Sequence, residues 1–124
     1  MNVVLLVGNL GKDPEMRYTP AGKAVVSATL ATNRRYTNAA GEKVNESDWH
    51  NLELWGNSAE AFATHAKKGA KISVEGRIKY EQWEADGVKH YKTKIVVTNW
   101  EFAGGAKNGN GQTEHEQAEE QADF

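Results

Sequence analysis

The chain has 124 residues, a formal net charge of −2 and no cysteine, and 39% of its residues are hydrophobic. This length fits one domain of about 100 residues, and the lack of cysteine excludes disulfides, thiolate zinc sites and a cysteine nucleophile. No apolar run reaches the roughly 18 residues needed to cross a bilayer. Met1 to Gly8 has neither the basic region nor the cleavage site of a signal peptide, so we expect a strand there and a cytoplasmic protein without a membrane partner.

Charge divides the chain into two parts. Residues 1–105 carry 14 Lys and Arg against 12 Asp and Glu, whereas residues 106–124 carry one lysine against five acids. The second part has almost no apolar residues, so we expect a folded, mildly basic domain over 1–105 and a disordered acidic tail over 106–124. This asymmetry of charge is one feature of nucleic-acid binders.

Two short patterns open the predicted domain. Val3 to Val7 is a continuous apolar run, which predicts a buried strand, and Gly8 to Gly11 predicts the turn after it. Residues 16–18 form a short segment between two turn signals, Asp13-Pro14 and 19–22.

A longer alternating pattern follows. Residues 24–33 alternate with period two and predict a second strand. The polar stretch 34–43 then predicts a hairpin arm or a long loop, with Arg34, Arg35 and Tyr36 at its base. A solvated hairpin tip without a binding role is the alternative, because charged runs often indicate exposure alone.

The stretch from Trp49 to Trp55 predicts a third strand with two unlike faces. Period two gives one face of Trp49, Asn51, Glu53 and Trp55 and another of His50, Leu52 and Leu54. The leucines form an ordinary core face, whereas the two indoles stand about 20 Å apart among polar residues. Such a surface suits nucleobases, which stack on aromatic rings whatever their sequence. Burial of the tryptophans under another sheet is the alternative.

One helix is expected after this strand. Asn57 and Glu60 have the spacing of a capping box, with Asn57 as the N-cap. Lys67 and Lys68 would place cations in the last turn, and Gly69 would be the C′ glycine.

Two further strands end the predicted domain. They cover residues 70–83 and 88–102, on either side of the two-residue hairpin signal Asp86-Gly87. Gly76 interrupts the apolar face of the first of them, as expected for a bend or bulge where a sheet curls.

Three strands, one helix and two strands predict an all-β OB-fold with one helix. This fold is a five-stranded antiparallel barrel, here with the helix between strands 3 and 4. Its second and third strands form the binding face, which favours stacking over burial for Trp49 and Trp55. A primosomal-type protein, an RNA-binding module and an oligosaccharide binder are alternatives on the same fold.

The sequence offers little for catalysis. The histidines are His50, His65, His90 and His115, and none has the HxxxH or HExxH spacing of a metal site. Neither a phosphate-binding GxxxxGK[ST] loop nor a GxSxG nucleophile motif occurs. We therefore expect a protein that is not an enzyme and uses no metal or cofactor.

The chain resembles the bacterial single-stranded DNA-binding protein family over residues 1 to about 103. The motifs that carry the resemblance are Val7-Gly8-Asn9-Leu10-Gly11, Asp13-Pro14-Glu15, Arg17-Tyr18, Ala31-Thr32, Trp49-His50, Leu54-Trp55-Gly56, Lys68-Gly69, Val74-Glu75-Gly76 and Trp83. The resemblance implies a homotetramer that binds and protects single-stranded DNA, whatever its sequence, in replication, recombination and repair. It also implies a cytoplasmic, nucleoid-associated location.

The resemblance also implies roles for individual residues. Bases would stack on Trp49, Trp55, Trp83 and Tyr36. The phosphate backbone would be contacted by Lys67, Lys68, Arg77 and Lys79. We expect Arg34, Arg35 and Lys71 to contribute to DNA binding as well. His50 matches a histidine near the subunit interface of the family.

This chain also departs from the family pattern. Asn51 and Asn57 stand where relatives often have cations, and acidic Glu81 precedes Trp83, so the phosphate contacts would be weaker here. The tail is short, but Asp123 and Phe124 keep an acidic and aromatic end. We expect this end to dock replication and repair proteins that offer a pocket with a basic rim; a frayed end without a role is the alternative.

Overall fold

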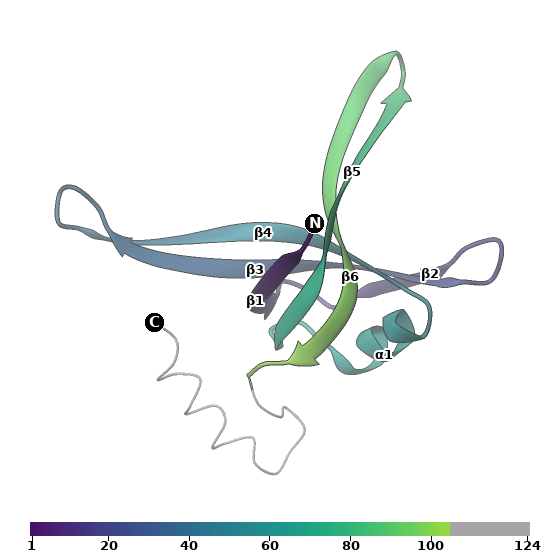
Figure 1. The fold of residues 1–124 in the computed structure, drawn as a ribbon, viewed down its shortest axis with the longest axis horizontal. Helices are drawn as coiled ribbons and strands as arrows, with labels where there is room; N and C mark the ends of the chain where they lie inside the picture. Colours follow the sequence, from purple (N-terminus) through teal and green to yellow (C-terminus); the bar gives the residue numbers. More distant parts are fainter. Residues whose placement is uncertain (105–124) are drawn as a thin grey trace, which may run out of the picture.

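The computed structural model describes residues 1–104, which form a small barrel with two long hairpins and one helix (Figure 1). The elements are β1 (Val4–Leu10), β2 (Glu15–Tyr18), β3 (Ala24–Thr37), β4 (Lys43–Trp55), α1 (Asn57–His65), β5 (Lys71–Ala85) and β6 (Val88–Phe102). The predicted acidic tail, with Asp123 and Phe124, lies outside the described residues. Within residues 1–104, no helix is long and apolar enough to cross a membrane.

The sheet closes on itself. Its strand order is β1-β5-β6-β4-β3-β2, and an additional pairing of β1 with β3 makes the first five of these a closed barrel. This confirms the predicted OB-fold, with α1 between the third and fourth barrel strands. One pairing differs from the antiparallel expectation: β4 and β6 run parallel where Leu52 meets Ile95 and Glu53 meets Val96. The reason is that β5 returns antiparallel to β4 after α1, and β6 then reverses again.

Two glycines allow neighbouring strands of the barrel to approach each other closely. A Cβ atom on Gly8 would collide with the carbonyl oxygen of Ala31, and one on Gly76 would collide with that of Val96. The predicted bulge at Gly76 is confirmed by a shift of register between Glu75 and Gly76. The predicted turn from Gly8 is wrong, because β1 continues to Leu10 and Gly8 serves this close approach.

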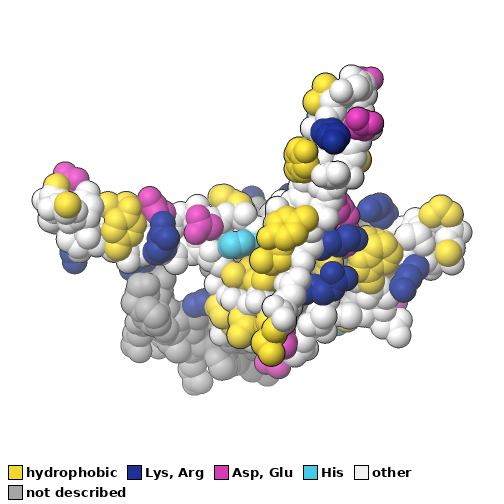
Figure 2. Space-filling view, turned by 45° about the horizontal axis from the view of Figure 1, so that its top comes forward, with side chains coloured by type: hydrophobic (Ala, Val, Ile, Leu, Met, Phe, Trp, Pro, Cys, Tyr) yellow, Lys and Arg dark blue, Asp and Glu magenta, His cyan; other side chains and the backbone are white. Residues whose placement is uncertain are grey.

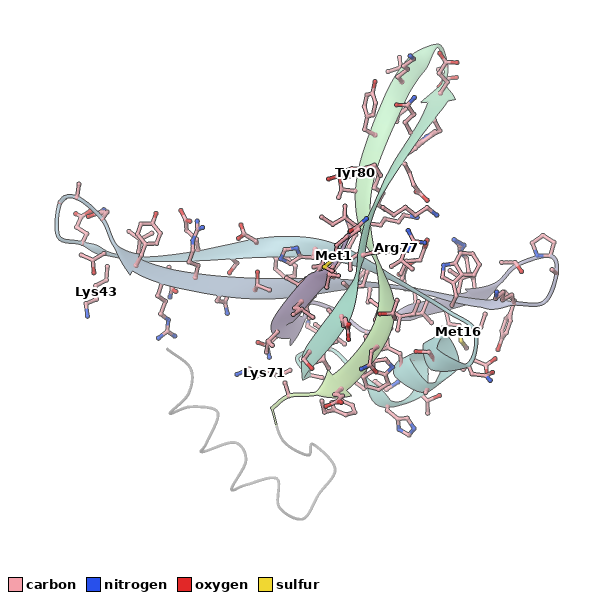
Figure 3. All side chains as sticks on the ribbon, in the orientation of Figure 1. Met1, Met16, Lys43, Lys71, Arg77 and Tyr80 are labelled. Atoms are coloured by element: carbon pink, nitrogen blue, oxygen red, sulfur yellow. The ribbon has the colours of Figure 1, made fainter. Side chains whose placement is uncertain are left out.

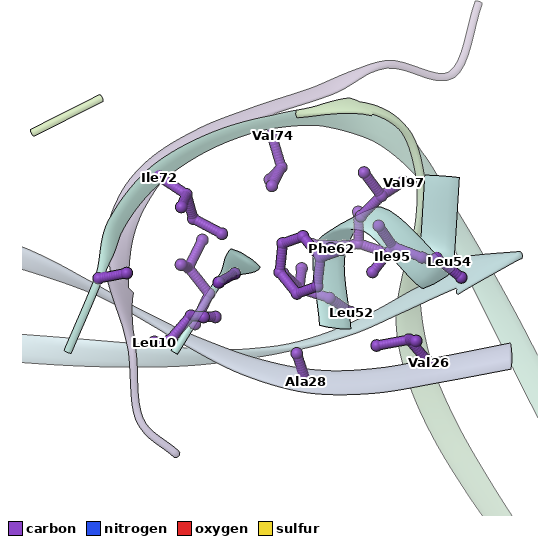
Figure 4. Packing of buried hydrophobic residues seen from close by; sticks show 14 of the residues in the cluster. Leu10, Val26, Ala28, Leu52, Leu54, Phe62, Ile72, Val74, Ile95 and Val97 are labelled. Atoms are coloured by element: carbon purple, nitrogen blue, oxygen red, sulfur yellow. The ribbon is translucent and has the colours of Figure 1, made fainter. Parts of the chain in front are cut away.

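The helix covers one end of the barrel and places an aromatic ring in the core. Phe62 has no exposed surface and lies among the side chains of the strands (Figure 4). Its ring meets the ring of Trp100 edge to face at 5.0 Å between centroids. Leu30, Leu54 and Ile72 are also fully buried.

The boundaries of the helix differ from the prediction. Gly56, with φ of 76°, is the N-cap, and no side chain caps the helix, so the predicted capping box of Asn57 and Glu60 does not form. The helix ends at His65, before Lys67 and Lys68. Gly69 is therefore no C′ residue; its N–H donates to the carbonyl of Leu10, so pairing with β1 replaces continuation of the helix.

Two hairpins extend the barrel strands into solvent. The β3–β4 arm (residues 34–48) is confirmed as a hairpin, since β3 and β4 stay paired out to Thr37 and Lys43. The β5–β6 arm (residues 77–94) turns at Asp86 and Gly87, whose φ values of 55° and 77° confirm the predicted two-residue turn. The segment before β3, predicted as a short segment between turns, is a sixth strand, β2, paired along β3.

Candidate nucleic-acid interface

Strand β4 separates the core from an exposed aromatic face. Leu52 and Leu54 are 2% and 0% exposed, whereas Trp49 and Trp55 are 62% and 39% exposed. The predicted alternation is therefore confirmed. Within this chain, the alternative in which both tryptophans are buried is wrong.

A groove of about 290 Å³ lies on the same face. Its lining comes from β2, β3, β4, β6 and the turn after β1, and consists of Lys12, Glu15, Arg17, Ser27, Ala28, Thr29, Asn51, Leu52, Glu53, Lys92 and Lys94. Ser27, Thr29, Asn51 and Glu53 belong to paired positions on β3 and β4. Because Asn51 and Glu53 stand between Trp49 and Trp55 on β4, the groove has a polar floor with an indole at each end.

Cations border this groove on two sides. Lys12 and Arg17 come from the β1–β2 segment, and Lys92 and Lys94 come from β6. Figure 2 shows Lys and Arg side chains beside hydrophobic side chains where the β5–β6 arm meets the body. The arrangement offers stacking surfaces for bases and positive charge for phosphates.

Close packing holds the indole of Trp49. A Cβ atom on Gly11 would lie 2.5 Å from Cζ3 of the ring, so the absence of a side chain at Gly11 makes room for the indole.

The strand pairings relate Trp49 to Lys71. Trp49 pairs with Ala31, Ala31 with Asn9 and Asn9 with Lys71. Lys71 is therefore three strands from Trp49, about 14 Å at the usual strand spacing.

Polar contacts hold the indole of Trp55. Its Nε1–H donates to Oε1 of Glu53 at 3.1 Å, and the ammonium group of Lys23 lies 5.8 Å from the ring centroid. Glu53 is 3% exposed, although it stands on the groove side of β4. Glu53 therefore places a buried carboxylate between the two tryptophans.

Lys94 balances this buried carboxylate. Its Nζ lies 2.9 Å from Oε2 of Glu53 and 3.0 Å from Oε1 of Glu81 on β5. Burial acts to raise the pKa of the Glu53 carboxyl, but the hydrogen bonds from Lys94 and Trp55 outweigh it and the pKa lies below its ordinary value. Burial likewise acts to lower the pKa of Lys94, but its two carboxylate partners raise it above the ordinary value.

The β5–β6 arm carries the third predicted tryptophan. Trp83 is 46% exposed, and its ring stacks on that of His90 with 5.5 Å between centroids and 19° between planes. Arg77 and Lys79 alternate onto the same face of β5 as Trp83. The register places Lys94, Lys92 and His90 of β6 on this face too, across from β5. The face that carries Lys92 and Lys94 in the groove therefore continues along the β5–β6 arm to Trp83. Figure 3 shows Arg77 at the base of this arm.

The other face of the β5–β6 arm carries two tyrosines. Tyr80 and Tyr91 are 75% and 69% exposed, and they alternate with Lys79 and Lys92 on their respective strands. Strand alternation therefore puts these tyrosines on the face opposite Trp83.

The predicted binding residues of the β3–β4 arm lie on two different faces of the arm. Arg35 shares the groove face with Trp49, whereas Arg34 and Tyr36 alternate onto the face of His50. Arg34 is hydrogen-bonded to Glu46, and the Tyr36 hydroxyl donates to the same carboxylate at 3.2 Å.

These contacts tie up charge on the β3–β4 arm. The hydrogen bonds from Arg34 and then Tyr36 hold the pKa of the Glu46 carboxyl below its ordinary value. The bond to Glu46 in turn raises the pKa of both Arg34 and Tyr36. A larger hollow of about 410 Å³ lies farther along this arm, lined by Arg35, Tyr36, Thr37, Lys43, Val44 and Asn45.

The remaining predicted residues lie on or after α1 and on the core side of β4. Lys67 donates to the carbonyl of Ala63, and the backbone N–H of Lys68 donates to Asp13, which holds this segment beside the β1–β2 turn. His50 is partly buried on the side away from Trp49, with its Nε2 3.0 Å from the hydroxyl of Thr32.

Sequence reasoning missed several groove residues. Lys12 and Arg17 were not predicted as binding residues, because the pattern of the short segment around β2 does not predict a strand beside β3. Lys92 and Lys94 did carry a signal, since they alternate onto one face with His90, which opposes Trp83 across a predicted hairpin. Within residues 1–104, no three His, Cys, Asp or Glu side chains gather as a metal site.

Comparison with known proteins relates the chain to one family. The model of the single-strand binding protein family matches residues 1–103. The chain is 36% identical over 113 residues to single-stranded DNA-binding protein 1 of Chlorobaculum tepidum, covering 90% of this chain and 70% of that protein. It is 43% identical over 122 residues to single-stranded DNA-binding protein 3 of Listeria innocua, covering 92% and 75%.

Solved structures share the fold. A deletion mutant of the single-stranded DNA binding protein from Thermus aquaticus is 34% identical with a TM-score of 0.75, covering 90% of this chain. This chain spans about half of that one, 52%. The Plasmodium falciparum SSB complex with ssDNA is 22% identical with a TM-score of 0.78, covering 83% of this chain and 95% of that chain, and supports the fold alone.

Proposed function

This chain belongs to the single-strand binding protein family, and on that premise we propose that its groove binds single-stranded DNA irrespective of sequence. The observation that carries the proposal is the polar groove on β3 and β4 with an exposed tryptophan at each end and cations on its rim. Every base has a face that can stack on an indole, so this surface selects unpaired strands rather than sequences. Binding would keep exposed strands unpaired during replication, recombination and repair, without chemical change to the DNA.

The path of the strand follows the residues that share this face. Bases stack on Trp49 and Trp55 and continue to Trp83 on the β5–β6 arm, while phosphates meet Lys12, Arg17 and Lys92 on the groove rim. Phosphates also meet a second group of cations, which consists of Arg35, Lys67, Lys68, Lys71, Arg77 and Lys79. Arg34 and Tyr36 contact a strand only if it passes round the β3–β4 arm, because they stand on its other face.

A fluorescence titration tests this function. Oligo-dT should quench the tryptophan fluorescence strongly and resist competition by duplex DNA, since paired bases cannot stack on the indoles. Oligo-U and an oligosaccharide serve as comparison ligands for the other binders known on this fold. Quenching by the sugar alone, or equal competition by duplex DNA, would refute the proposal.

We further propose that the protein works as a homotetramer. Val3, Leu5 and Val7 are 54%, 71% and 53% exposed, which leaves an apolar stripe along and just before β1. His50 is assigned to a subunit contact because it faces away from Trp49. Light scattering should give four chains per particle, and His50→Tyr should shift the mass downward at low protein concentration. A monomer at all concentrations, or a His50→Tyr tetramer that persists at nanomolar concentration, would contradict these assignments.

The proposed partners extend beyond DNA. Asp123 and Phe124, outside the described residues, are assigned to docking of replication and repair proteins. Such a protein would work in the cytoplasm at the nucleoid. Deleting Phe124 should weaken capture of these partners and leave affinity for oligo-dT unchanged; loss of DNA affinity instead would contradict the assignment.

A further inference from the structure

A negative charge stands inside the proposed DNA groove. The side chain of Glu53 is 5% exposed and lies on the floor between the two tryptophans of β4. A carboxylate there repels phosphate and is costly to bury, so its place in the groove needs a compensating role.

The contacts of Glu53 indicate that role. One carboxylate oxygen accepts the indole N–H of Trp55 at 3.1 Å, and the other accepts from Lys94 at 2.9 Å. An indole has one N–H, so this bond fixes the tilt of the Trp55 ring, although Trp55 is 39% exposed. Lys94 is itself 18% exposed and shared with Glu81 on β5.

We propose that Glu53 is a positioning residue for Trp55, with Lys94 as its structural counter-ion rather than a phosphate contact. The network fixes the Trp55 ring for stacking and joins it to the base of the β5–β6 arm through Glu81. This inference rests on the proposed binding of single-stranded DNA, and it assigns Lys94 a role different from that of its neighbour Lys92 on the groove rim.

The proposal and simple charge counting predict opposite signs. Removing an acid from a groove that binds a polyanion should strengthen binding if only charge matters. Glu53→Gln offers one acceptor oxygen to two donors, Trp55 and Lys94, so one of these contacts is lost. We expect affinity for oligo-dT to fall by about 5–10-fold, at the lower end of the range that one base stack contributes.

Glu81→Gln is the matched control. Glu81 lies on β5 and contacts Lys94 and Lys79, whereas the indole N–H of Trp55 donates to Glu53. Its replacement should raise affinity at low salt, since it removes negative charge without freeing the indole. If Glu53→Gln raises affinity as Glu81→Gln does, the positioning role is refuted; wild type that does not bind oligo-dT at all refutes the proposed function instead.

A double-mutant cycle with Trp55→Ala gives the second measurement. If Glu53 acts through the indole, Glu53→Gln should not lower affinity further once Trp55 is alanine. An undiminished loss in that background overturns the proposal. If Glu53→Gln fails to fold in a thermal melt, Lys94→Gln provides the test: the salt slope of binding should stay unchanged, whereas Lys92→Gln should reduce it by about 0.7. A reduction of that size for Lys94→Gln would make Lys94 a phosphate contact and overturn the proposal.

Discussion

The two arms leave the same barrel but differ in charge. The β3–β4 arm holds three cations and three acids, whereas the β5–β6 arm holds five cations and three acids. On the first, Arg34 is paired with Glu46 across the strands. On the second, Arg77, Lys79 and Lys92 line the face that carries Trp83. From this comparison we expect the β5–β6 arm to attract phosphates and stack a base, and the β3–β4 arm mainly to shape the path of the strand.

Trp83→Ala tests the comparison with the largest expected effect. Loss of one stacking surface should weaken binding of oligo-dT by about 1–3 kcal/mol in a titration, with the thermal melt unchanged. Tyr80→Ala is the control, because Tyr80 is exposed on the other face of the same arm. A greater loss for Tyr80→Ala would place the DNA on that face.

Lys92→Gln tests the electrostatic part of the same arm. Because a phosphate contact releases a counter-ion, this change should reduce the slope of log K against log salt by about 0.7. The measurement is a titration series at several salt concentrations. Lys43→Gln near the tip of the β3–β4 arm (Figure 3) should change the slope less, and an equal change would remove the difference between the arms.

Glu46→Gln should bring the β3–β4 arm closer to its neighbour. The substitution frees Arg34 from its carboxylate partner and leaves the arm with one net positive charge. Affinity for oligo-dT should rise slightly at low salt, and the gain should shrink as salt screens it. Unchanged affinity at every salt concentration would mean that the DNA does not reach this face of the arm.

Acid should affect the β3–β4 arm and the base of the β5–β6 arm, where Glu53 of β4 contacts Lys94, to different extents, with the smallest effect of the series. The pKa values of Glu46 and Glu53 are both lowered in the folded protein. A carboxylate with a lowered pKa contributes stability at pH values above its pKa in the unfolded chain, about 4.3. This contribution is lost as the pH falls through the lower pKa of the folded protein.

Urea unfolding at pH 7 and 3.5 measures this loss of stability. Glu53→Gln should remove more of it than Glu46→Gln, since their side chains are 5% and 43% exposed. Equal effects of the two substitutions on stability would contradict the larger stabilising role assigned to the buried Glu53 at the base of the β5–β6 arm.

Local patterns predicted much of this molecule. Period two alone separated Leu52 and Leu54 from Trp49 and Trp55, because strand alternation depends only on neighbouring residues. Asp86 and Gly87 predicted their turn because both positions need φ values that few residue types adopt readily.

Features that depend on distant segments could not be read in the same way. The pairing of Arg34 with Glu46 depends on the register of a long hairpin, and Glu53 meets Lys94 only after the barrel closes. Gly8 looked like a turn residue because its close approach to Ala31 cannot be seen in a single strand.

Photo-crosslinking tests the central claim most directly. Oligonucleotides of 5-bromodeoxyuridine would be irradiated on the protein, and the attached residues mapped by mass spectrometry. The account predicts crosslinks at Trp49, Trp55 and Trp83, which share the groove and its continuation on the β5–β6 arm. Crosslinks confined to Tyr80 and Tyr91, with the three tryptophans unmodified, would contradict it.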